Sequence, residues 1–107
     1  MTGGYRLSRT AEAELGETLL YVADRDSVER ALHVHGQFVR AFEQIAERPD
    51  SGVKRPELTG DRHRWRSVFR WIVLDDPSDS PITVLRVAHG AQALGAILGP
   101  EGPEESR

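Results

Sequence analysis

The stretch "HRWRSVFRWIVLDDPSDSPITVLRVAH", residues 63–89, decides the fold. Its apolar and polar side chains alternate with the period of two that is typical of β-strands. The segment "DPSDSP" in its middle is rich in turn-forming residues, so we expect two strands joined by a turn. Two apolar strands that flank a short turn most economically pair antiparallel. Both faces of each strand are largely apolar, which predicts that both faces are covered or that one is the floor of a groove.

Two arginines interrupt rows of side chains that are otherwise apolar. The first strand carries one row of Val68, Arg70, Ile72 and Leu74 and another of Phe69, Trp71 and Val73; the second carries Ile82, Val84, Arg86 and Ala88 opposite Thr83, Leu85 and Val87. A guanidinium cannot shed its charge and is expensive to bury without a partner. Arg70 and Arg86 therefore each need a carboxylate, a groove open to solvent, or an anionic partner. Pairing with Asp75, Asp76 or an acid of a helix is the structural alternative to a functional groove.

Two amphipathic helices are expected before these strands. After a short strand at "YRLS", residues 5–8, Ser8 is placed to cap a helix because its hydroxyl can accept a bond from a first-turn amide. Apolar side chains then recur at helical spacing, at Ala11, Leu15, Leu19 and Val22. Asp26 and Glu29 have the spacing of a capping box for a second helix. Because only a short break separates the two helices, they are expected to form an antiparallel hairpin.

The second helix carries a long apolar stripe that ends at Pro49. Its members are Val28, Ala31, Leu32, His35, Phe38, Val39, Phe42, Ile45 and Ala46. His35 lies on this stripe, so core or interhelical packing is a better expectation for it than a ligand role. His33 lies off the stripe and is expected to be solvated.

These elements predict a single α+β domain over residues 1–98. An N-terminal strand precedes the helical hairpin, which packs on a twisted antiparallel sheet in an order close to β–α–α–β–β–β. A chain of 107 residues is long enough to bury one core without disulfides or a structural metal. The segment "GPEGPEESR", residues 99–107, is acidic and rich in glycine and proline, and we expect this tail to be disordered.

Several classes of chemistry find no support in the composition. The chain has no cysteine, which excludes disulfides, thiolate nucleophiles and cysteine-ligated metal centres. It contains no Walker loop, no GxGxxG, no HExxH and no nucleophile elbow. We therefore expect no cofactor and no metal. The N-terminal residues lack the apolar segment of a signal peptide and no window approaches a membrane span, so a cytoplasmic location is expected.

Charge is concentrated in one basic block within an acidic chain. The net charge is −3 and the pI about 5.8, which disfavours a general nucleic-acid binder. Residues 51–74 nevertheless carry a balance of +4, and the segments before and after them carry −3 and −4. The cations of the block are Lys54, Arg55, Arg62, Arg64, Arg66 and Arg70. This block is either a solvated surface or a binding site for an anionic partner.

Aromatic and titratable residues near this block add candidates for a site. Trp65 and Trp71 alternate with arginines, an arrangement that suits stacking on nucleotides, although core packing is the more frequent use of tryptophan, above all for Trp71. His89 ends the second strand beside Gly90, and histidine is the residue type that exchanges a proton near neutral pH. The candidate site residues are Arg62, Arg64, Trp65, Arg70, Arg86 and His89.

Four stretches of the chain, taken together, resemble the RelE/ParE superfamily of bacterial toxins from type II toxin–antitoxin operons, and more particularly its ParE branch. They are "YRLSRTAEAEL" at 5–15, "AFEQIAERPDSG" at 41–52, "RHRWRSVFRWIVLDD" at 62–76 and "ITVLRVAHG" at 82–90. The last is similar to the closing strand of the family, with its Arg-x-x-His-Gly. Each motif is short, but their order and spacing extend the resemblance over roughly residues 4–95.

The resemblance implies both a fold and a partner. The fold is the helical hairpin on a twisted antiparallel sheet already expected, and the partner is an antitoxin whose C-terminal segment wraps the toxin and blocks it. A hetero-oligomer of toxin and antitoxin is therefore expected. ParE-type members poison DNA gyrase without established nuclease activity, whereas RelE-type members are ribosome-dependent messenger-RNA endonucleases with a basic groove.

Carried over residue by residue, Arg86 and His89 match the arginine and histidine of the family's closing strand. Arg70 is a looser match to an arginine of the preceding strand, and Arg62 and Arg64 match by region. In a ribonuclease, Arg70 and Arg86 would stabilise the charge that develops on the scissile phosphate, and His89 would act as acid or base.

Two departures from the family pattern bear on the choice of branch. Family members often have Arg-Asp after His-Gly-Ala, where this chain has Gln92 and Ala93, which weakens any role that rests on that arginine. Lys54 is the sole lysine, so the lysine-rich groove of the ribonuclease branch is missing. Together with the acidic pI, this favours a gyrase-inhibiting binding protein over an endoribonuclease. The alternatives are a RelE-type ribonuclease and a non-toxic member that acts as a regulatory binding partner.

Overall fold

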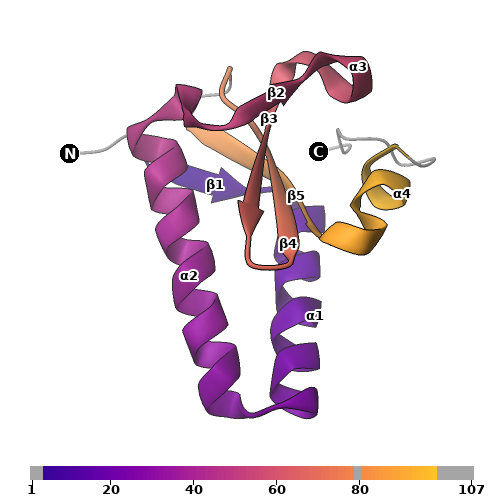
Figure 1. The fold of residues 1–107 in the computed structure, drawn as a ribbon. Helices are drawn as coiled ribbons and strands as arrows, with labels where there is room; N and C mark the ends of the chain where they lie inside the picture. Colours follow the sequence, from indigo (N-terminus) through magenta and orange to yellow (C-terminus); the bar gives the residue numbers. More distant parts are fainter. Residues whose placement is uncertain (1–3, 79–80, 99–107) are drawn as a thin grey trace.

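The computed structural model describes residues 4–78 and 81–98 of the chain. In chain order its elements are β1 (Tyr5–Leu7), α1 (Arg9–Arg25), α2 (Val28–Glu47), η1 (Pro49–Ser51), β2 (Val53–Arg55), α3 (Pro56–Thr59), β3 (Gly60–Val68), β4 (Trp71–Asp76), β5 (Ile82–His89), η2 (Gly90–Gln92) and α4 (Ala93–Leu98). Figure 1 shows α1 and α2 as a helical hairpin beside the sheet, with α4 following the end of β5. The α+β class and the helical hairpin packed on a sheet are therefore confirmed.

The sheet has five strands in the order β1–β5–β4–β3–β2. The pairs from β2 to β5 are antiparallel, whereas β1 pairs parallel with β5, with Tyr5 opposite Ile82. The expectation of a wholly antiparallel sheet is therefore wrong at this edge. The reason is the connection between the strands: a tight turn would force an antiparallel pair, but β1 and β5 are separated in the chain by both helices and by β2, β3 and β4, so no turn fixes their relative direction.

The first of the two strands predicted within residues 63–89 is in fact a β-hairpin. β3 ends at Val68 and β4 begins at Trp71, and these two residues are partners across a two-residue turn of Phe69 and Arg70. Arg70 therefore lies in a turn, and not in a strand row beside Arg86 as expected. Neither residue of the turn is a glycine, proline or asparagine, so the alternation of side chains gave no sign of it.

The N-terminal cap of α1 is the predicted residue, whereas the cap of α2 lies one residue later than predicted. Ser8 caps α1 as expected, because its hydroxyl accepts a hydrogen bond from the Ala11 amide at 3.0 Å. The cap of α2 is Ser27, whose hydroxyl accepts a hydrogen bond from the Arg30 amide at 3.0 Å. Asp26 still belongs to the end of α1. The capping-box expectation for α2 is therefore wrong by one residue.

The buried face of α2 is narrower than the predicted stripe. Its buried members are Ala31, Val34, Phe38, Ala41, Phe42 and Ile45. His35 was expected to be buried and is exposed, together with Val28 and Leu32. These three side chains lie on one flank of the helix, because the face centred on Phe38 is the one that meets the sheet. His33 is exposed, as expected.

Two apolar cores cover the two faces of the sheet. The larger joins α1 and α2 to strand residues that include Val73. In the smaller, Ala93 and Ile97 of α4 join Leu74. Neighbouring residues of β4 thus serve opposite cores, which explains why both faces of the predicted strands are apolar. Trp71 packs against the larger core, which confirms the expectation for this tryptophan.

Residues 99–107, for which a disordered tail is predicted, lie outside the described residues. Within residues 4–78 and 81–98, none of the helices combines the length and the apolarity that crossing a membrane would require.

Candidate functional site

Arg86 on β5 is buried and paired with an acid of α1. Its guanidinium atoms Nη2 and Nε lie 2.9 and 3.2 Å from carboxylate oxygens of Glu14, and the two side chains are 6% and 19% exposed. The same carboxylate accepts a hydrogen bond from the Val87 amide at 2.8 Å. Glu14 thus neutralises the guanidinium and satisfies a backbone amide of β5. For this arginine, pairing with a helix acid is what the structure shows.

The position of Glu14 follows from the way the chain leaves the sheet. After the short strand β1, the Ser8 amide donates to the Val84 carbonyl at 2.9 Å, and the Ser8 hydroxyl donates to the Leu85 carbonyl at 2.8 Å. The chain then turns into α1, so β5 loses its neighbouring strand at this point. The Val87 amide would be left without a partner on that edge. Glu14, early in α1, supplies the missing acceptor.

Arg70 and His89 lie together at one end of the sheet. The Arg70 carbonyl accepts a hydrogen bond from the Gly90 amide at 2.6 Å. Trp71 is the strand partner of His89, and their rings stand edge to face with centroids 6.0 Å apart. Both Arg70 and His89 are exposed. We call the β3–β4 turn together with His89 and Gly90 the tip.

The tip borders an open pocket of about 390 Å³ that it shares with the end of α1 and the start of α2. The pocket is lined by Tyr21, Val22, Arg25, Asp26, Arg30, Val34, Phe69, Arg70 and Trp71. Arg25 lies over the ring of Tyr21, 5.1 Å from its centroid, and Arg30 lies over the ring of Phe69 at 5.8 Å. These contacts hold each cation without neutralising it. The pocket is therefore aromatic and net positive.

A second pocket, of about 490 Å³, continues along α1 and shares Tyr21 and Trp71 with the first. Its other lining residues are Glu14, Glu17, Thr18, Val87, Ala88, His89 and Gln92. The acids of this pocket, Glu14 and Glu17, lie on α1, and His89 of the tip lines it as well. The surface beside α1 thus changes from acidic near Glu14 to basic at the tip.

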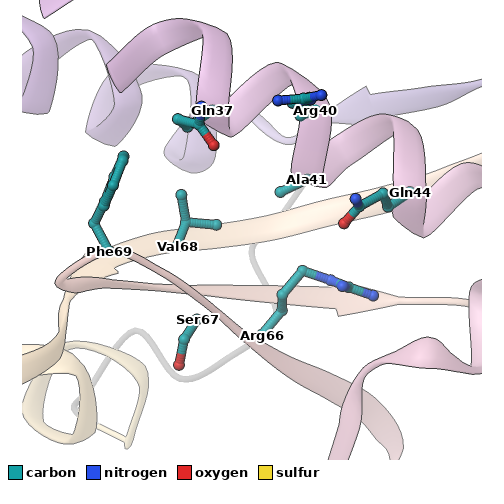
Figure 2. Close-up of a pocket in the computed structure, with 8 residues that line it drawn as sticks. All are labelled: Gln37, Arg40, Ala41, Gln44, Arg66, Ser67, Val68 and Phe69. Carbon is teal, nitrogen blue, oxygen red and sulfur yellow. The ribbon is translucent and has the colours of Figure 1, made fainter. Parts of the chain in front are cut away.

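A third pocket, of about 310 Å³, lies between α2 and β3 (Figure 2). It is lined by Gln37, Arg40, Ala41, Gln44, Arg66, Ser67, Val68 and Phe69. Arg40 and Arg66 are its charged side chains, and Arg66 also donates to the hydroxyl of Ser51. Phe69 stands at one end of this pocket in Figure 2 and also lines the pocket at the tip. One aromatic residue therefore borders two basic pockets.

The remaining predicted residues lie nearer the start of β3. The Nε atom of Arg62 is 2.7 Å from the carboxylate of Asp76, and Arg64 donates to the Asp61 carbonyl at 3.0 Å. Trp65 is buried in the smaller core, and its indole nitrogen donates to a threonine hydroxyl at 2.8 Å. The structure therefore does not bring these three residues to the tip.

The tip offers binding chemistry more readily than bond-breaking chemistry. The Ala91 amide donates to His89 Nδ1 at 3.3 Å, so this ring nitrogen is occupied as an acceptor. Arg86, the partner that a ribonuclease would require, is held by Glu14. Across the described part of the chain, no three histidine, aspartate or glutamate side chains gather to hold a metal ion. An exposed guanidinium beside aromatic rings suits a carboxylate- or phosphate-bearing partner.

Comparison with known proteins assigns the chain to a family. Residues 5–94 match the family model described as "ParE toxin of type II toxin-antitoxin system, parDE". The chain belongs to this ParE toxin family. Among solved structures, it is similar to the "Chromosomal ParDE TA system from P. aeruginosa", with a TM-score of 0.69, 17% sequence identity, and coverage of 80% of this chain and 94% of that chain. At that identity the likeness supports the fold alone. No curated protein matches the chain.

The sequence did not reveal which residues surround Arg70 in this ParE-family chain. Arg25 and Arg30 were polar positions on two helices, and their approach to the β3–β4 turn depends on how the helical hairpin packs. A turn near Phe69 could have been predicted from strand length. A single strand spanning the whole apolar stretch would far exceed the usual length of about 5–6 residues. Nothing in the sequence marked Glu14 as the partner of Arg86, because it was one of several acids in the first predicted helix.

Proposed function

We propose that this chain is the toxin of a toxin–antitoxin pair, that it inhibits DNA gyrase through protein contacts in the cytoplasm, and that a cognate antitoxin neutralises it within a hetero-oligomer. The observation that carries the proposal is the match to the ParE toxin family over residues 5–94. The site supports a binding role, because its exposed part is a net-positive aromatic tip. The arginine that a ribonuclease would need is buried against Glu14.

The second candidate function is that of a RelE-type ribonuclease. One observation favours it: Arg70 and His89 are both exposed at the tip, on segments that the Gly90 amide joins. In that function the guanidinium would stabilise charge on a phosphate and the imidazole would move a proton. Two features weigh against it, namely the single lysine of the chain, Lys54, and the pairing of Arg86 with an acid of α1.

Induction of this chain alone in a bacterial host, followed by pulse labelling, separates the two functions. Gyrase inhibition predicts an early fall in DNA synthesis, with a DNA-damage response, while protein synthesis continues. A ribonuclease predicts an early fall in protein synthesis instead. Co-expression of the proposed cognate antitoxin is the control and should restore growth. If neither synthesis falls while folded chain accumulates, this chain is not a toxin.

A further inference from the structure

Phe69 occupies a backbone conformation that bulky side chains rarely adopt. It is the first residue of the two-residue β3–β4 turn and has a φ of 54°. Two-residue hairpin turns with positive φ at this position favour glycine or asparagine. Phe69 is 53% exposed, so the unfavourable backbone does not serve to bury an apolar group. Strain that packing does not explain is a sign of function.

Three arginines line the same pocket as this ring and make no ion pair with any residue that the structure describes. Arg30 lies over the ring at 5.8 Å, Arg70 follows it in the turn, and Arg25 lies in the same pocket over Tyr21. Asp26 is the one acid among the lining residues of that pocket. The whole chain has a net charge of −3, so this positive patch does not follow from the composition. Charge complementarity therefore selects an acidic partner.

We propose that Phe69 is the anchor through which the tip binds the protein that this toxin inhibits, and that this partner presents an acidic surface with a recess for an aromatic ring. The inference rests on the proposed function, under which the partner is DNA gyrase. Aromatic residues and arginines are the side chains most enriched in protein interfaces. A few such residues carry most of the binding free energy. The arginines orient the approaching partner, and the ring supplies the apolar contact.

A purely structural role for Phe69 makes a different prediction. That role would rest on the contacts of the ring with Arg30 and with His33, whose ring centroid is 6.1 Å away. Both partners are exposed side chains of α2, so these contacts are weak. Glycine at position 69 would remove them but would adopt the positive φ without strain. A structural role therefore predicts that Phe69→Gly lowers stability, whereas an anchor role predicts that stability is kept or raised while binding is lost.

The test compares Phe69→Gly and Phe69→Asn with the wild-type chain in thermal unfolding, in growth arrest after induction, and in binding to immobilised purified DNA gyrase. We expect both variants to unfold at or above the wild-type temperature. We expect their affinity for gyrase to fall at least about tenfold, and growth arrest to be lost. Leu20→Ala is the matched control, because this side chain is 73% exposed and lines none of the three pockets. It should change none of the measurements.

The outcomes separate the anchor role from the proposed target. Folded variants that still arrest growth and bind gyrase would overturn the proposal. Unfolding temperatures well below wild type would overturn it as well, by making Phe69 a structural residue. If the wild-type chain arrests growth without binding gyrase and the variants do not arrest growth, the proposed target is wrong while the anchor role stands. If the wild-type chain does neither, the proposed function and this inference fail together.

Discussion

Asp75 lies buried on β4, the middle strand of the sheet, and no described residue donates a hydrogen bond to its carboxyl oxygens. Burial raises the pKa of Asp75 from 3.8 to about 7, although Arg66 and Arg64 partly oppose the shift. The folded state therefore holds the proton more tightly than the unfolded state does. The stability that this group contributes is fully present below pH 3.8 and is lost as the pH rises through 7.

Replacement of Asp75 with asparagine should stabilise the protein above neutral pH. The asparagine stays neutral where the wild-type carboxyl must ionise without a hydrogen-bond donor. The raised pKa corresponds to a gain of at most about 4 kcal/mol at pH 8.5, and the gain should shrink as the pH falls towards 4.5. Urea unfolding at the two pH values measures this gain in the free energy of unfolding.

The control is Asp76→Asn, which should destabilise the protein at pH 8.5. The Asp76 carboxylate is 2.7 Å from Arg62 Nε and accepts a hydrogen bond from the Ser78 hydroxyl at 2.6 Å. An Asp75→Asn variant no more stable than wild type at pH 8.5 would show that this carboxyl is solvated.

Replacement of Arg86 should lower the stability of the fold, whatever its effect on target binding. Arg86→Ala leaves the Glu14 carboxylate buried without its cation, and breaking a buried pair in this way costs about 3–5 kcal/mol in the free energy of unfolding. Denaturant unfolding measures the loss. Arg6→Ala, which removes an exposed arginine of β1, is the control and should stay close to wild type. Reduced toxicity of Arg86→Ala at unchanged stability would instead assign this residue a direct functional role.

At the level of secondary-structure elements, a close backbone contact joins the β3–β4 turn to Gly90, the residue that follows β5. The Gly90 amide donates to the Arg70 carbonyl at 2.6 Å, and a Cβ atom at position 90 would lie 2.9 Å from that carbonyl oxygen. A side chain at Gly90 would therefore push the turn away. The glycine of the Arg-x-x-His-Gly stretch thus has a physical reason, which is to let the β3–β4 turn lie against the start of η2.

Gly90→Ala should accordingly loosen the tip. The added methyl meets backbone, which cannot rotate away as a flexible side chain would, so we expect a loss of about 1–3 kcal/mol in the free energy of unfolding. Hydrogen exchange of the β3–β4 hairpin amides should speed up in parallel. Gly16→Ala on α1 is the control, because nothing lies within 4 Å of its added Cβ, and it should gain about 0.5–1 kcal/mol. Equal stability of Gly90→Ala and wild type would mean that the turn yields without cost.

At the scale of the whole molecule, local patterns predicted the elements and long-range packing decided the site. The α+β class and the helical hairpin followed from helical spacing and from the Ser8 cap, which depend on neighbours in sequence. The pairing of Arg86 with Glu14 spans 72 residues, and no periodicity encodes it. Of the candidate site residues, Arg70 and His89 come together. Phe69 was missed because a phenylalanine contradicts the residue preferences of such turns.

Inhibition of DNA gyrase by direct binding is the function proposed for this ParE-family chain, and purified components test it. The most direct measurement is the ATP-dependent supercoiling of relaxed plasmid by purified gyrase as increasing amounts of the purified chain are added. A gyrase inhibitor should cause a dose-dependent loss of supercoiling that the cognate antitoxin reverses. Full supercoiling in the presence of an excess of folded chain would contradict it.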